Sequence, residues 1–539
     1  MFTESFTGSF HDPLRRIYVP AVRVVAEDGC RDAGSLVGNR VLRGFVGCGM
    51  PVCRIEEGGW LLLDFGRELT GGVRLVTGGA MKEARVRLRF GESVSEAMGQ
   101  PDMDHAVHDV ELPLRAYSAV DFGGTGFRFL RLDAVSGAPE LHNVIARAEY
   151  LPLERIGRFR SSEERIDRIF DTCAHTLHLN MQDCILDGVK RDRLPWGGDM
   201  HPETSGILRI FGAVPEIGDT LERLCKETAA GKFVNGHIEN PLWLLWTIRD
   251  LWFYGGDGGV PEVFADFVTD SVERYRAMIR EDGAVEFPGR LFLDWGSSGE
   301  PAAVHAGVCA LLVLAFRGAR ELYRELGLDP APVDGALELL ARRVPDPVGN
   351  KRAAALQHLA GIADRRAVLE DEPLRKVGTF LGYYILLAKE NRAALELIRK
   401  FWGGMLDMGA TSFWEDFDLD WLRGAPTRID ELPVAGRPDI HADFGAYCYK
   451  GLRHSLCHGW AAGPAAWISR RILGVEPLAP GFSVLRFAPD LCGLEYAEGS
   501  VPTPRGAVRV RLEAGKKPEI AVPGGVEVEF GTDGKNIFP

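Results

Sequence analysis

The hydrophobic period of the sequence changes twice along the chain, and this limits the folds that the chain can adopt. Up to about residue 155, short segments such as 84–90 and 127–132 alternate apolar with basic residues, which is typical of strands with one wet face. From about residue 161 the apolar residues recur at helical spacing, and alternation returns beyond Pro477. The pattern predicts a multidomain β plus α protein with an N-terminal β-sandwich (1–155), a helical domain (156–475) and a small C-terminal β-domain (476–539).

The middle region contains about eleven or twelve predicted helices separated by loops with Gly and Pro. Ser161 and Glu164 have the spacing of a capping box for the first of them. The others are predicted at 203–211, 216–229, 239–254, 260–280, 302–325, 332–343, 353–362, 374–388, 391–402 and 456–473. This number of helices would suit six hairpins closed into a toroid, but also a superhelix or a bundle. No internal repeat supports a regular solenoid.

Composition and charge argue against several classes of protein. The 539 residues are 46% hydrophobic and 26% charged, as in ordinary soluble proteins. The formal net charge of −13 argues against a nucleic-acid partner, which would require a basic face. We find no apolar run long enough to span a bilayer and no secretory signal at the N-terminus, so we expect a cytoplasmic protein without a membrane partner. The ten cysteines lack the spacing of a metal site.

One short stretch, residues 187–199, combines several groups that can carry chemistry. Its glycines and Pro195 forbid a continuous helix, so it is predicted to be a loop between two helices. A charge cluster by itself is more often a solvated surface loop. The large apolar ring of Trp196 instead favours a loop that takes part in binding or catalysis. The stretch contains three carboxylates, three cations and one indole, which are Asp187, Asp192, Asp199, Lys190, Arg191, Arg193 and Trp196.

Four tryptophans lie beside polar clusters near predicted loops or helix ends: Trp196, Trp295, Trp414 and Trp460. A sugar ring has apolar C–H faces and polar edges, so its site needs aromatic platforms between carboxylates and guanidinium groups. We therefore interpret these four as candidate sugar platforms, and Asp294, which precedes Trp295, as a further substrate contact. Trp243, Trp246 and Trp467 lie within apolar helices and are expected in the core.

Three motifs together resemble the family 78 α-L-rhamnosidases. In the first, an acid precedes Arg-Leu and is followed by Trp four residues later and Asp seven residues later, as at Asp192, Trp196 and Asp199. The second is 409–415, Gly-Ala-Thr-Ser-Phe-Trp-Glu, and the third is 455–460, Ser-Leu-Cys-His-Gly-Trp. The motifs occur in the order of the family, and the resemblance covers nearly the whole chain. It implies a central (α/α)6 toroid of the six-hairpin type between two β-domains.

The resemblance also implies a function and assigns roles. It implies an inverting hydrolase that removes terminal α-L-rhamnose by general acid/base catalysis and needs neither a metal nor an organic cofactor. Asp192 occupies the position of the general acid and Glu415 that of the general base. Most members of the family have Glu where this chain has Asp192, and an Asp is shorter and more acidic. The implied substrate-binding residues are Asp187, Arg191, Asp199 and His458, which join the tryptophans and Asp294 named above.

Two other interpretations stay open. The chain could be another glycosidase of the six-hairpin group that acts on a different sugar, since Asp192 departs from the family pattern. It could also be a catalytically silent sugar-binding protein that keeps the pocket and lacks a working acid. Turnover of an aryl α-L-rhamnoside, compared with a panel of other aryl glycosides, separates the three.

Overall fold

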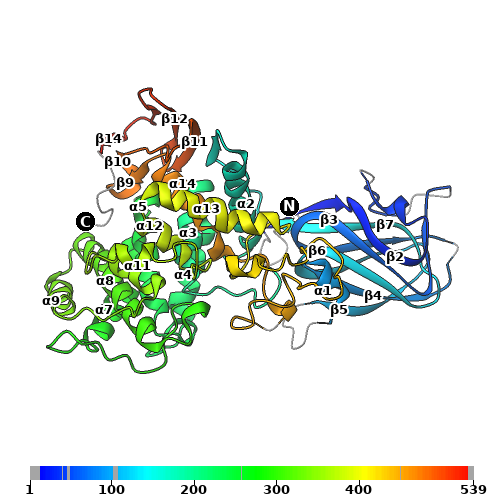
Figure 1. Cartoon of the computed structure of the whole chain (residues 1–539), viewed down its shortest axis with the longest axis horizontal. Coiled ribbons are helices and arrows are strands. Elements are labelled where there is room, and N and C mark those ends of the chain that lie inside the picture. Colours follow the sequence, from blue (N-terminus) through cyan, green and yellow to red (C-terminus); the bar gives the residue numbers. More distant parts are fainter. Residues whose placement is uncertain are drawn as a thin grey trace, which may run out of the picture.

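A computed structural model describes residues 13–38, 41–44, 49–79, 81–100, 107–256, 258–449 and 451–531. Strands occupy its N-terminal part, helices the middle, and strands again the C-terminal part (Figure 1). The predicted class, a multidomain β plus α fold, is confirmed.

The N-terminal strands form one seven-stranded sheet with the order β1-β7-β3-β6-β4-β5, in which β2 also pairs with β3. Its centre is β3, a strand of 25 residues that pairs antiparallel with β6 and parallel with β7. Phe65, Phe90 and Phe127 pack edge to face in its core, with ring centroids 5.1 and 5.6 Å apart. The strands are β1 (Arg15–Pro20), β2 (Arg23–Arg31), β3 (Cys53–Thr77), β4 (Ala84–Gly91), β5 (Asp109–Leu114), β6 (Ala119–Ser136) and β7 (Glu140–Tyr150).

One short helix, α1 (Val94–Met98), lies in this domain, where we predicted strands only. Ser93 begins it, because the Ser93 side chain accepts a hydrogen bond from the backbone N–H of Glu96. The turn that begins α1 contacts the helical domain, since the backbone N–H of Val94 donates to the carbonyl of Ile429 at 2.8 Å.

The helices form two concentric rings. In the inner ring α3, α5, α8, α10, α12 and α14 contact one another in sequence, and α14 closes the ring on α3. The outer helices α2, α4, α7, α9, α11 and α13 pack against them, so the described helices form a toroid rather than a superhelix or a bundle. The helices are α2 (Glu164–Asn180), α3 (Met200–Ile210), α4 (Pro215–Glu227), α5 (Asn240–Gly255), α6 (Val260–Val263), α7 (Ala265–Arg276), α8 (Pro301–Glu325), α9 (Ala331–Leu340), α10 (Lys351–Leu359), α11 (Arg366–Glu370), α12 (Gly382–Ala388), α13 (Asn391–Asp407) and α14 (Gly463–Arg471).

Several details of the helical region differ from the prediction: the helix predicted at 456–473 begins only at Gly463, and the one predicted at 260–280 divides into α6 and α7. The capping box does not form, because Ser161 ends a strand and its hydroxyl accepts the N–H of Glu163 and donates to Asp167 at 2.9 Å. The helix predicted from residue 374 begins only at Gly382, since the chain turns at Gly378 with φ of +71°.

The C-terminal strands form two small sheets. One has the order β14-β10-β9, and the other β13-β12-β11-β8. Strand β8 (Arg158–Ser161) precedes the first helix of the toroid but pairs with β11, so the chain contributes to the terminal domain before entering the helical one. Arg209 of α3 joins β9 to the toroid through a buried ion pair with Glu476 at 3.0 Å. The remaining strands are β9 (Val475–Pro477), β10 (Val484–Phe487), β11 (Tyr496–Thr503), β12 (Gly506–Glu513), β13 (Glu519–Ala521) and β14 (Glu527–Phe530).

Helix α8 corrects the expectation that no segment has the length of a membrane span. Among the described residues, Pro301–Glu325 is long and apolar enough by length and composition, with a mean hydropathy of 1.8. Within this fold, however, 83% of that window is buried inside the protein. The helix is apolar on all sides because it lies in the inner ring, where α5 and α10 flank it.

A core substitution in α8 tests this packing. Leu312 is fully buried, so Leu312→Ala should lower the free energy of unfolding by about 2–5 kcal/mol through lost burial and a residual cavity. Chemical denaturation measures the change. Arg324→Ala, at an exposed position of the same helix, should change stability by no more than about 0.5 kcal/mol. Equal effects at the two positions would contradict the burial of α8.

Candidate active site

A cavity of about 450 Å³ lies where the loops that carry all three motifs meet. Its wall includes carboxylates, a histidine and several aromatic rings, which is the composition expected for a site that binds a sugar. Eight of the predicted site residues line it, namely Asp187, Asp192, Trp196, Asp199, Trp295, Glu415, His458 and Trp460.

The loop 187–199 connects α2 with α3, as predicted, and it is held against the third motif through the backbone. Gly188 and His458 form an antiparallel bridge, and the N–H of Gly459 donates to the carbonyl of Asp187 at 2.9 Å. Asp192 and Arg193 both have left-handed backbone conformations, with φ of 57° and 54°. Non-glycine residues adopt this region at a cost, and such residues cluster at functional sites.

Arg191 joins the first motif to the second. Its Nη1 lies 3.1 Å from the carboxylate of Asp192, and its Nη2 forms an ion pair with Glu415. Its Nε donates to the carbonyl of Arg453 at 2.7 Å, and the guanidinium lies over the ring of Tyr449, 3.5 Å from the centroid. Burial acts to lower the pKa of Arg191, but Glu415, Tyr449 and Asp192 together outweigh it and the pKa is raised. Arg191 therefore holds two carboxylates on one buried cation.

Glu415 is buried and surrounded by donors. Its Oε1 accepts the indole N–H of Trp295 at 3.1 Å, and its Oε2 accepts the backbone N–H of Ser455 at 3.3 Å. Burial acts to raise the pKa of Glu415, but Arg191 and His458 lower it to about 2. The carboxylate is thus ionised at neutral pH, which is the state in which it can accept a proton.

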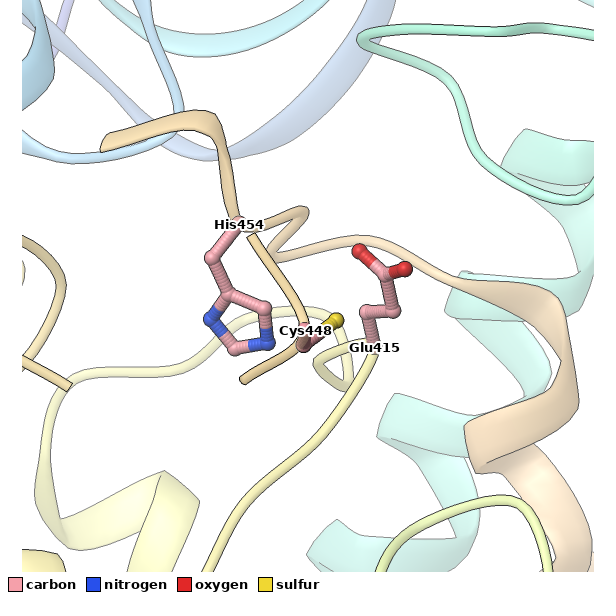
Figure 2. A group of neighbouring side chains, drawn as sticks. All are labelled: Glu415, Cys448 and His454. Atoms are coloured by element: carbon pink, nitrogen blue, oxygen red, sulfur yellow. The ribbon is translucent and has the colours of Figure 1, made fainter. Parts of the chain in front are cut away.

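Cys448 and His454 lie beside Glu415, as Figure 2 shows, and their possible ligand atoms are all within 4.8 Å of one another. The contacts do not favour a metal ion. The charge of Glu415 is balanced by Arg191, and the Nε2 of His454 accepts the N–H of Asp416 at 3.0 Å. Burial raises the pKa of the Cys448 thiol well above its usual value, so the thiolate that a metal prefers is disfavoured.

A cluster of acids surrounds His458, and two of its members, Asp187 and Asp199, line the cavity. The His458 Nε2 is 3.0 Å from the carboxylate of Asp199. Burial raises the pKa of Asp187 to about 8, and it raises the pKa of Asp199 and of Glu203 as well. The two carboxyl oxygens of Glu203 are buried without a hydrogen-bond partner among the described residues. Asp187 therefore keeps its proton at pH 7, and in this state it can donate a hydrogen bond into the cavity.

Aromatic rings form the rest of the wall in two layers. Buried rings lie at the bottom, where Phe380 and Trp460 stack with centroids 4.8 Å apart. Half-exposed rings line the rim and contact one another edge to face, each 5.1 to 6.1 Å from the next; they are Trp196, His237, Phe292, Trp295 and Tyr449. Such a wall suits the apolar faces of a sugar.

Three predicted site residues do not line the cavity. Trp414 is buried and packs edge to face on Phe417, because the extended segment turns its ring into the core and only Glu415 toward the site. Asp294 pairs with Arg352 at 2.6 Å and accepts the N–H of Ser297, so its oxygens are occupied. Arg191 lies behind the carboxylates and reaches the cavity only through them.

Several lining residues had no signal in the sequence pattern. Glu239, before α5, is 2% exposed; its Oε1 is 3.0 Å from the Nδ1 of His237, and its Oε2 is buried without a partner among the described residues. Trp243, predicted to be core, is buried but also faces the cavity. The helical spacing that marks a core position does not distinguish a ring that packs on protein from one that packs on ligand.

The described helices form a ring of helical hairpins, and the aromatic-lined cavity lies where loops of this ring meet. Residues 154–239 match the model of the bacterial alpha-L-rhamnosidase 6 hairpin glycosidase domain, and residues 474–530 match that of the bacterial alpha-L-rhamnosidase C-terminal domain. The resemblance inferred from the motifs is thus confirmed over these two stretches, which match domain models of the bacterial alpha-L-rhamnosidases.

Individual relatives are distant. An alpha-L-rhamnosidase of Alteromonas sp. (strain LOR) is 22% identical over 87% of this chain, and this chain spans 55% of its length. Among solved structures, a family 78 rhamnosidase of Bacillus sp. GL1 is 21% identical with a TM-score of 0.69, over 91% of this chain and 54% of that one. A rhamnosidase of Klebsiella oxytoca with rhamnose bound is 20% identical with a TM-score of 0.66, over 85% and 96%. These structures share the fold.

The raised pKa of Asp187 predicts a dependence of stability on pH. In the unfolded chain Asp187 ionises near its ordinary value of 3.8, whereas in the folded protein it keeps its proton up to about pH 8. Its contribution to stability is therefore complete below about pH 4 and is lost as the pH rises toward 8. Asp187→Asn does not titrate and can still accept the N–H of Leu194. The melting temperature of the variant should rise relative to wild type between pH 4 and pH 8, and a difference independent of pH would contradict the raised pKa.

Proposed function

We propose that this protein is an inverting glycoside hydrolase that removes terminal α-L-rhamnose from glycosides or oligosaccharides. One observation carries the proposal: Arg191 holds the carboxylates of Asp192 and Glu415, one from each of two motifs, beside one aromatic-lined cavity. Glycoside hydrolysis needs two such carboxyl groups, one to protonate the leaving oxygen and one to activate water. The two matching family domains supply the choice of sugar.

Glu415 is the general base of this proposal. It is ionised, buried and oriented by Trp295 and Ser455, so it can take a proton from a water molecule on one side of the sugar. Asp192 is the general acid. It is the more exposed of the two carboxyls, which suits a group that must reach the leaving oxygen, and only its Oδ2 is paired with Arg191.

The span of one guanidinium limits the distance between the two carboxyl groups. Asp192 binds one end of the Arg191 fork and Glu415 the other, so two hydrogen-bond lengths and the width of the fork limit their nearest oxygens to roughly 8 Å. Retaining pairs, about 5–5.5 Å apart, and inverting pairs, about 6.5–9.5 Å apart, both fit under this limit, so the choice of inversion rests on the resemblance to family 78.

The other polar groups of the cavity hold the sugar. Neutral Asp187 can donate to a hydroxyl and Asp199 can accept from one, while His458 keeps Asp199 oriented. The orphaned oxygen of Glu239 supplies a further acceptor, because a buried carboxylate oxygen without a donor is satisfied by a ligand hydroxyl. The stacked rings below them bind the apolar face.

A panel of nitrophenyl glycosides tests the sugar and separates the three interpretations. We expect turnover of the α-L-rhamnoside and little of the other sugars. Preferred turnover of a different glycoside would identify another member of the six-hairpin group. Binding of L-rhamnose, seen by calorimetry, without turnover of any glycoside would identify a silent sugar-binding protein.

The two carboxyl groups should respond differently to the leaving group. Asp192→Asn keeps the shape of the side chain but cannot give an acidic proton, so turnover of rhamnosides with an alcohol leaving group should fall by roughly 10²–10⁴-fold. Nitrophenolate leaves almost unaided, so the fall in turnover of a nitrophenyl rhamnoside should be much smaller. Glu415→Gln should impair both substrates alike, because both need the attack of water.

Steady-state kinetics on the two classes of substrate measures this difference. If Asp192→Asn slows both substrates equally, Asp192 is a sugar-binding residue and the acid is another carboxyl of the cavity, such as Asp187 or Asp199.

A further inference from the structure

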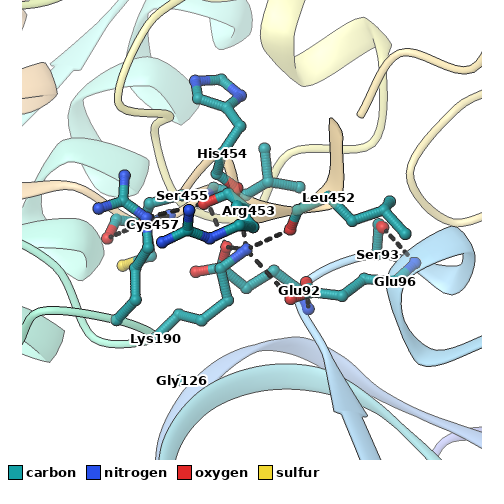
Figure 3. Close-up of polar contacts among 12 residues, drawn as sticks. Glu92, Ser93, Glu96, Gly126, Lys190, Leu452, Arg453, His454, Ser455 and Cys457 are labelled. Carbon is teal, nitrogen blue, oxygen red and sulfur yellow. Dashed lines mark hydrogen bonds and ion pairs between the residues drawn. The ribbon is translucent and has the colours of Figure 1, made fainter. Parts of the chain in front are cut away.

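A buried lysine connects the N-terminal sheet domain to the candidate active site. Lys190 is 2% exposed and directly precedes Arg191. Its ammonium forms ion pairs with Glu92 at 3.0 Å and Glu96 at 3.1 Å, which lie at the turn that begins α1 (Figure 3). It also donates to the carbonyls of Leu452 at 3.0 Å and His454 at 2.9 Å. One cation thus binds two acids of the N-terminal domain and two carbonyls beside the site.

Lys190 fixes the segment 452–456 through its hydrogen bonds to two carbonyls. The carbonyl between its two acceptors, that of Arg453, binds the Nε of Arg191. The next two N–H groups donate to carboxylates: Ser455 donates to Glu415 at 3.3 Å and Leu456 donates to Glu92 at 2.6 Å. Because the segment accepts from Lys190 and Arg191 and donates to Glu415, a shift of this segment moves the donors of the proposed base.

Strand β6 of the N-terminal sheet touches the same loop. A Cβ on Gly126 would lie 2.4 Å from the side chain of Val189 and 3.1 Å from the backbone N of Lys190. The hydroxyl of Thr125 donates to the carbonyl of Lys190 at 3.3 Å. The sheet therefore approaches the backbone of this loop so closely that only glycine fits at position 126.

The charges around Lys190 fit a fixed, buried cluster. Burial raises the pKa of Glu92 to about 7, so one proton can be shared between two acids that face a single lysine. Removing one member of such a cluster leaves a buried charge without its partner. Other ionisable groups that act on this cluster include Glu68, His108, Arg191, His441 and His454.

We propose that Lys190, Glu92 and Glu96 are positioning residues of the active site. Through them the N-terminal domain holds the segment 452–456, and with it Arg191 and Glu415, in the geometry that catalysis needs. The N-terminal sheet is then part of the catalytic unit rather than an independent module. The tests of this inference that measure turnover rest on the proposed function.

Three variants of the full chain separate positioning from stability. Lys190→Met removes the cation and its hydrogen bonds. Lys190→Met/Glu92→Gln also removes a carboxylate charge, while the amide oxygen introduced by the second substitution can still accept the N–H of Leu456. Arg209→Met is the matched control, since it removes a buried cation that joins α3 to β9 and does not line the cavity.

For Lys190→Met we expect kcat on an aryl rhamnoside to fall by about 10–100-fold with little change in KM, the size of effect that a misplacement of about 1 Å produces. The double variant should regain much of the lost melting temperature and keep the low kcat. Arg209→Met should lower the melting temperature and leave kcat of the folded enzyme unchanged. Wild-type kcat in Lys190→Met, recovery of kcat together with stability in the double variant, or an equal loss of kcat in Arg209→Met would each overturn the proposal.

A measurement without turnover keeps the two proposals distinguishable. Crystal structures of the wild type and the double variant should show the Ser455 N–H to Glu415 contact, 3.3 Å in the wild type, lengthened beyond hydrogen-bonding distance in the variant. An unchanged contact would refute the positioning role. If the wild type turns over no glycoside, the proposed function fails, and this comparison still decides whether Lys190 positions the segment.

Discussion

The double ion pair of Arg191 is the interaction on which the site depends. Two carboxylates from distant parts of the chain would repel each other in a buried pocket, and one guanidinium with two free ends removes that repulsion and fixes their spacing. The same cation keeps the pKa of Glu415 low although burial acts to raise it. A lysine could neutralise one carboxylate there but could not bind both with fixed geometry.

Around this ion pair the protein has brought together segments from all parts of the chain. The loop 187–199 enters from the first hairpin, Glu415 and the segment 452–456 from the last, and Glu92 from the N-terminal sheet. Each segment has a buried polar group that another segment satisfies. Opposite environments result within one cavity: Glu415 is held ionised by cations, whereas Asp187 is held neutral by burial near other acids. Glu415 can therefore accept a proton, while Asp187 can donate a hydrogen bond to a ligand.

Much of this organisation could be predicted from the sequence because it follows from local patterns. The change between period 2 and period 3.6 located the strands and helices, and the glycines with Pro195 located the loop at 187–199. The motif resemblance brought Asp192, Glu415 and His458 to one site. Closure of the helices into a ring came only from that resemblance, since periodicity does not say which helices are neighbours.

The errors arose where a residue's role depends on a partner far away in the sequence. Asp294 and Trp414 have the same acid–aromatic surroundings as Glu415 and Trp295. Asp294 nevertheless forms an ion pair with Arg352, and Trp414 is buried in the core. Nothing in the local pattern links Lys190 to Glu92 or marks Glu239 as a wall of the cavity. The apolar character of α8 likewise shows that it is buried, but only the ring of helices shows which elements bury it.

The central claim is that Arg191 spaces Asp192 and Glu415 for a single attack by water. The anomeric form of the first sugar released tests this claim most directly. Proton NMR during the first minutes of hydrolysis of an aryl α-L-rhamnoside distinguishes the two anomers before they interconvert. We expect β-L-rhamnose, the inverted product, to appear first. Initial release of α-L-rhamnose would mean that a covalent intermediate forms, and it would contradict the role of Glu415 as a base.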